Sequence, residues 1–185
     1  VEQVAGPRSS YIPVDSSNDV VPHVPVWAHV SFFTFGVGVL LPWNAILASL
    51  DLYILLFPDV HVGMAFSVAY MWPMYLTTIL ALFISADYHQ SSILAGVLTF
   101  AISTLCLPAI APVAPVRGHS NIHFVGTLAI IAIIGKANAL VQSSLFATAA
   151  MFPGSSCTHA LNAGGGLAGV LIAGLRIVTL VVLAP

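Results

Sequence analysis

Charged side chains are the scarcest component of this chain. Four Lys and Arg and six Asp and Glu occur among 185 residues, so charged residues make up 5%. A soluble domain carries about 25% charged residues, so a water-exposed globular surface is excluded. The absence of a clustered basic face also excludes electrostatic binding of nucleic acid. With 59% hydrophobic residues and a mean hydropathy of +1.03, the composition points to a lipid bilayer as the surroundings of this chain.

Groups that carry catalysis or hold a cofactor are also missing. The sequence has no glycine-rich phosphate loop, Ser-His-Asp arrangement, paired carboxylates or cysteine-rich cluster, so we expect no catalytic residues and no enzyme activity. Cys106 and Cys157 stand apart in apolar runs and are interpreted as small packing residues. His119 and His123 have i, i+4 spacing but no third ligand, so neither a metal site nor a cofactor is predicted. Histidines near the helix ends are expected to make ordinary hydrogen bonds. The alternative is that they ligate a haem or a pigment.

Long apolar runs are what the chain has in abundance. A bilayer crossing takes about 20 residues, and five runs reach that length, separated by short connectors that carry Pro, Gly or a charge. They lie at residues 26–56, 63–85, 92–113, 122–152 and 158–183. Because short connectors join antiparallel neighbours, we predict an all-α, multi-pass integral membrane protein with a five-span up-and-down bundle over residues 26–185. Residues 1–25 form a polar segment rich in Pro and Ser.

The first apolar run contains an interruption, Pro42-Trp43-Asn44. A straight helix over residues 26–56 would be about 46 Å long, more than the hydrocarbon core of about 30 Å. Pro42 removes a backbone donor and is predicted to bend this helix, and Asn44 is placed to bond a backbone group that the bend frees. Trp and Asn are costly at mid-span unless they face protein, water or a ligand. Both a packed kink and a ligand-facing site fit this pattern.

Two further sets of residues predict helix contacts. Gly135, Asn138 and Gln142 fall within about 60° of one another at 100° per residue, so they share one helix face. Amide side chains on such a face bond either a neighbouring helix or a polar solute. Gly165 and Gly169 form a small-xxx-small pair, which predicts tight packing of the last span.

Three charged residues lie inside the apolar runs. Asp51 and Arg176 lie toward the far ends of the first and last spans, so we predict that they pair and relieve each other's desolvation cost. Lys136 lies near mid-span, where a charge costs roughly 3 kcal/mol, and at least 120° around the helix from the Asn138–Gln142 stripe. It faces a wet cavity, reaches toward the interface, or pairs with a group from outside the chain.

Three segments resemble the N-terminal half of an equilibrative nucleoside transporter. They are the Gly36-Val37-Gly38-Val39-Leu40-Leu41-Pro42-Trp43-Asn44 run, the Lys136–Phe146 segment with Gln142, and the glycine-rich 164–171 segment followed by Leu175-Arg176-Ile177-Val178-Thr179. The resemblance implies a bundle like part of the N-terminal bundle of a major-facilitator-like transporter with eleven spans, and a cytosolic N-terminus, which loop charges alone leave open. It also implies that Trp43 forms an aromatic surface against a nucleobase and that Gln142 contacts the base or ribose, with Asn44 and Asn138 completing the substrate-binding set.

The sequence therefore supports two functions of different kinds. In the first, the chain is part of a transporter that facilitates passage of nucleosides or nucleobases, a reading that Trp43, Asn138 and Gln142 favour. In the second, it is a transport-incompetent accessory subunit of a larger respiratory or photosynthetic membrane complex, with other membrane subunits as its partners. The start at Val1 and the absence of a second bundle of helices favour this second reading.

Overall fold

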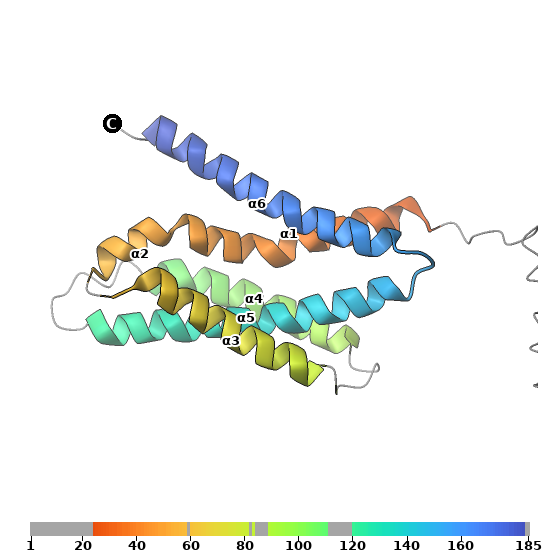
Figure 1. The fold of residues 1–185 in the computed structure, drawn as a ribbon, viewed down its shortest axis with the longest axis horizontal. Coiled ribbons are helices and arrows are strands. Elements are labelled where there is room, and N and C mark those ends of the chain that lie inside the picture. Colours follow the sequence, from red (N-terminus) through yellow and green to blue (C-terminus); the bar gives the residue numbers. More distant parts are fainter. Residues whose placement is uncertain (1–23, 59, 82, 84–88, 111–119, 184–185) are drawn as a thin grey trace, which may run out of the picture.

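The regular structure of the chain is helical throughout the part that can be described. The computed structural model describes residues 24–58, 60–81, 83, 89–110 and 120–183, so most of the polar segment 1–25 and His119 lie outside the described residues. The helices are α1 (Val26–Ala48), α2 (Leu50–Leu56), α3 (Val62–Ala81), α4 (His89–Ile110), α5 (Ser120–Ala150) and α6 (Ser156–Leu183). Successive long helices run in opposite directions, and α6 diverges from the others toward its C-terminal end (Figure 1).

The described helices have the length and composition of membrane spans. Four segments are long and apolar enough to cross a bilayer: Val26–Ala48, Val62–Ala81, Ile122–Ala150 and Ser156–Val182. The apolar part of α4 within the described residues, Ser91–Leu107, is shorter. The chain is thus a multi-pass integral membrane protein whose regular structure is helical in all its described segments. The fifth crossing, expected at residues 92–113, stays a prediction because residues 111–113 lie outside the described ranges.

The first apolar run forms two helices where the sequence predicted one. α1 continues through Pro42 and ends at Ala48, and α2 begins at Leu50. At the break, the Ser49 N–H bonds the carbonyls of both Ala45 and Ile46, and the Ser49 hydroxyl donates to the Ala45 carbonyl at 2.9 Å. Side-chain bonds of this kind compete with the regular helix pattern. The sequence predicted one span over residues 26–56 with a bend at Pro42, whereas the structure interrupts the helix at Ser49.

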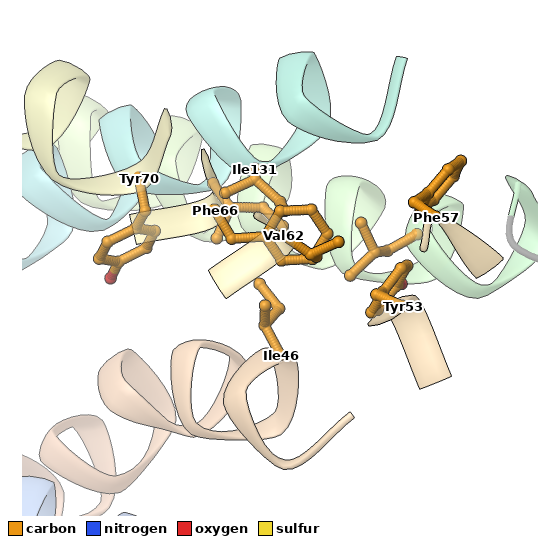
Figure 2. Close-up of a cluster of buried hydrophobic side chains, with 9 residues drawn as sticks. Ile46, Tyr53, Phe57, Val62, Phe66, Tyr70 and Ile131 are labelled. Atoms are coloured by element: carbon orange, nitrogen blue, oxygen red, sulfur yellow. The ribbon is translucent and has the colours of Figure 1, made fainter. Parts of the chain in front are cut away.

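The helices pack as two groups that share a core. α1 packs along α6, while α5 lies between α3 and α4. One face of α3 supplies Val62, Phe66 and Tyr70 at four-residue spacing, and these meet Ile46 from α1 and Ile131 from α5 (Figure 2). This cluster joins the two groups, because its members come from helices of both.

Glycines allow α1 and α6 to approach at the level of their backbones. A Cβ added to Gly164 would collide with the carbonyl oxygen of Phe33, and a Cβ on Gly36 would collide with that of Leu161. The predicted pair makes looser contacts: a Cβ on Gly165 would lie 2.8 Å from Leu40 Cδ1, and one on Gly169 would lie 3.7 Å from Asn44 Oδ1. Tight packing of α6 against α1 is confirmed, and Gly36 and Gly164 lie where the two helices approach most closely.

We expect Gly164→Ala to destabilise the protein by about 1–3 kcal/mol, because the added methyl group meets backbone that cannot rotate away. The matched control is Gly166→Ala on the same helix, where nothing lies within 4 Å of the added Cβ. That control should be neutral or stabilising, since Ala favours a helix over Gly by about 1 kcal/mol. Thermal unfolding of the purified native protein in nanodiscs measures both. Equal stability of the two variants would contradict the close approach of α1 and α6.

Candidate functional site

Three side chains from three helices meet in the interior of the bundle. The ring of Trp43 on α1 stacks on the ring of Tyr70 on α3, with centroids 4.0 Å apart and planes inclined by 19°. Asn138 on α5 donates from Nδ2 to the Tyr70 hydroxyl at 2.8 Å. We call Trp43, Tyr70 and Asn138 the aromatic–amide cluster. It combines a π surface with an amide and carries no charge.

A glycine on α5 positions this cluster. A Cβ added to Gly135 would collide with the backbone carbonyl of Tyr70. The missing side chain therefore lets α5 approach α3 closely, and Asn138, one turn further along α5, then reaches the Tyr70 hydroxyl. Tyr70 itself is 2% exposed, so its ring is held between α1 and α5.

Only one of the two polar atoms of the Asn138 side chain has a hydrogen-bond partner among the described residues. The residue is 1% exposed, and its Oδ1 has no hydrogen-bond partner within the described residues. A buried polar atom left without a partner costs about 1–3 kcal/mol. Asn138 therefore retains the capacity to accept one more hydrogen bond.

The other two predicted substrate contacts lie apart from the cluster. Asn44 is half-buried and donates from Nδ2 to the Leu40 carbonyl at 2.8 Å, and its Oδ1 faces Gly169 of α6. Since the carbonyl that Pro42 leaves without its helical donor is that of Gly38, the expectation that Asn44 bonds the freed group was wrong. Gln142 lines a cavity of about 40 Å³ between α1, α5 and α6. Roles for Asn44 and Gln142 in substrate binding stay predictions.

Tyr70 is the cluster residue that the sequence reasoning missed. An available signal was the spacing of Val62, Phe66 and Tyr70, which places the phenol on the buried stripe of an apolar helix. A buried Tyr hydroxyl usually finds a hydrogen-bond partner. The partner could not be named, because helix periodicity does not say which faces of α3 and α5 meet.

The chain resembles known proteins over most of its length. The chain is 33% identical over 95% of its length to equilibrative nucleotide transporter 1 of Arabidopsis thaliana, of which it covers 40%. It is 30% identical over 82% of its length to equilibrative nucleotide transporter 8 of the same plant, of which it covers 39%. It is also 33% identical over 78% of its length to equilibrative nucleotide transporter 4, of which it covers 34%.

The chain is similar to equilibrative nucleotide transporters over most of its own length. It spans about two fifths or less of the length of these curated relatives. No protein-family model matches it, and no solved structure does. The resemblance found in the sequence is confirmed, and the chain is a transporter-like membrane protein.

The charged side chains of the described residues do not belong to the aromatic–amide cluster. Arg176 on α6 donates from its guanidinium to the carboxylate of Asp51 on α2, as the sequence predicted. Asp51 is the only acidic residue within the described ranges. Lys136 is exposed although Asn138, two residues along α5, is buried, which agrees with their predicted separation around the helix. Within the same ranges, no group of three His, Cys, Asp or Glu is placed to hold a metal ion.

We expect the Asp51–Arg176 pair to stabilise the protein through its charges. Asp51→Arg and Arg176→Asp each place like charges together, so each single variant should lower the unfolding temperature, whereas the double exchange should restore it. An exposed pair contributes at most about 1 kcal/mol in water, and the effect should grow in nanodiscs because lipid raises the cost of an unpaired charge.

Thermal unfolding of the native protein in detergent and in nanodiscs measures this effect. Lys136→Met serves as the control, since it removes a described cation that makes no ion pair with the described residues. A double exchange that is no more stable than the single variants would contradict the pairing.

Proposed function

We propose that the chain supplies part of the substrate path of an equilibrative transporter that moves nucleosides, nucleobases or nucleotides down their gradients. The aromatic–amide cluster carries this proposal. Polar and aromatic groups buried inside a membrane bundle mark substrate pathways, and a flat π surface beside an amide matches the two recognition features of a nucleobase, its faces and its hydrogen-bonding edge. The names of the relatives support the same class of substrate.

In this proposal, residues 26–185 form five spans that resemble part of the N-terminal bundle of a major-facilitator-like transporter. The described helices support it by their alternating directions (Figure 1). Transporters of this kind bind substrate near the bilayer midplane between two bundles. Trp43, which is half-buried, provides the stacking surface, and Asn138 provides the amide. Asn44 and Gln142 contribute from neighbouring positions on α1 and α5.

The alternative proposal is that the chain is an accessory subunit of a larger membrane complex. The C-terminal half of α6 exposes Leu175, Ile177, Val178, Leu180 and Val181. These residues cover more than one face of the helix at 100° per residue, so lipid or another polypeptide covers this half of α6. Such a surface fits a foreign subunit as well as a second bundle of the same protein.

The intact mass of the polypeptide from native membranes separates the two functions. A mass near 19.3 kDa leaves no second bundle and favours the accessory subunit. A mass more than twice as large provides the missing spans and favours transport.

We expect Trp43→Ala to reduce uptake of radiolabelled nucleoside by the native protein in proteoliposomes. The loss should be about 5- to 150-fold in kcat/KM, the equivalent of one lost base–aromatic stack. The matched control is Trp72→Ala on α3, since Trp72 is 64% exposed and should transport like the unaltered protein. Equal transport by the Trp43 and Trp72 variants would contradict the assignment of Trp43.

A further inference from the structure

Tyr70 makes the two contacts that the proposed function assigns to a nucleobase. Its ring lies nearly parallel to that of Trp43 at a centroid distance of 4.0 Å, which is a stacking geometry. Its hydroxyl bonds the Asn138 amide at 2.8 Å. An aromatic ring with a hydrogen-bonding substituent thus already lies between the residues that would receive the base.

Tyr70 satisfies Asn138 less completely than a nucleobase would. A carboxamide has both a donor group and an acceptor atom, and the phenol takes up only the donor Nδ2 while Oδ1 remains without a partner in the described part of the chain. Nucleobases present a donor and an acceptor side by side, and Asn bonds adenine through both its amide atoms. Exchange of the phenol for such an edge therefore gains one hydrogen bond.

We propose that Tyr70 is an internal competitor for the nucleobase site, so that bases with an adjacent donor and acceptor displace it from Trp43 and Asn138 more readily than other aromatic ligands do. This inference rests on the proposed function. It makes Tyr70 a specificity-determining residue, because a ligand must provide more than the phenol provides. An aromatic ligand without a donor gains nothing over Tyr70.

Space for the displaced ring adjoins the same core. A cavity of about 520 Å³ lies between α1, α2, α4 and α5 and is lined in part by Ile46, Tyr53 and Ile134. Ile46 and Ile134 also belong to the buried cluster that contains Tyr70. The lining is mainly apolar, which suits an aromatic ring better than it suits a ribose with its hydroxyl groups.

The test is Tyr70→Phe in the full-length native protein. This change keeps the ring and its packing but removes the hydroxyl that bonds Asn138. We expect adenosine to bind about 2- to 12-fold more tightly, the equivalent of one neutral hydrogen bond no longer in competition. Equilibrium binding of radiolabelled adenosine in nanodiscs measures this change.

Tyr75→Phe is the matched control, because Tyr75 lies on the same helix and is 59% exposed. It should leave adenosine affinity unchanged. The unfolding temperature of the Tyr70→Phe variant should fall, since Asn138 then lacks its remaining hydrogen-bond partner, while the affinity for adenosine rises. A residue with only a structural role would not raise affinity while lowering stability.

Two further comparisons link the effect to Asn138. The gain from Tyr70→Phe should disappear in an Asn138→Ala background, which a double-mutant cycle measures. Purine riboside lacks the 6-amino donor and should bind the unaltered protein about 2- to 12-fold more weakly than adenosine.

The outcomes separate this inference from the proposed function. If the unaltered protein binds adenosine but Tyr70→Phe binds it equally or more weakly, Tyr70 is no competitor, whereas the proposed function stands. If neither protein binds adenosine nor any other nucleoside, the proposed function fails and the inference fails with it.

Discussion

Close approach of helix backbones is the constraint on which this structure depends. Lipid tails are as apolar as the side chains they surround, so the hydrophobic effect does little to hold membrane helices together, and packing at small residues takes its place. Gly36 and Gly164 let α1 and α6 meet at the backbone, and Gly135 does the same for α5 and α3. The last contact brings Asn138 within reach of the Tyr70 hydroxyl. The geometry of the aromatic–amide cluster is thus a consequence of a missing Cβ.

The buried polar groups add directional contacts to this packing. Several hydroxyl side chains in the described helices bond the carbonyl four residues earlier, as Thr127 and Thr148 do, and so satisfy themselves within their own helix. The Asn138–Tyr70 bond differs because it joins two helices. An interhelical bond of this kind fixes rotation as well as distance, whereas a glycine contact fixes distance alone. The two devices together determine which face of α3 meets α5.

The sequence predicted those features that depend on one helix or on matching depth. Apolar length located four spans, and the heights of Asp51 and Arg176 in two parallel helices located their ion pair. The sequence did not predict features that depend on which helix faces meet. Asn138 and Gln142 lie one turn apart, yet the first bonds α3 and the second lines a cavity beside α1 and α6. Apolar periodicity also did not register the interruption of the first span at Ser49, where the structure separates α1 from α2.

The lack of charge in the aromatic–amide cluster bears on what the proposed site recognises. A nucleotide differs from its nucleoside by a phosphate, and proteins bind phosphate through Arg, Lys or the N-terminus of a helix. Of the described cations, Arg176 is engaged with Asp51 and Lys136 is exposed on α5, and neither belongs to the cluster. Trp43, Tyr70 and Asn138 are therefore suited to the base, which nucleobases, nucleosides and nucleotides share. Discrimination among those three classes requires groups that contact ribose or phosphate, so changes within the cluster should alter the choice of base and leave the choice of phosphorylation state unchanged.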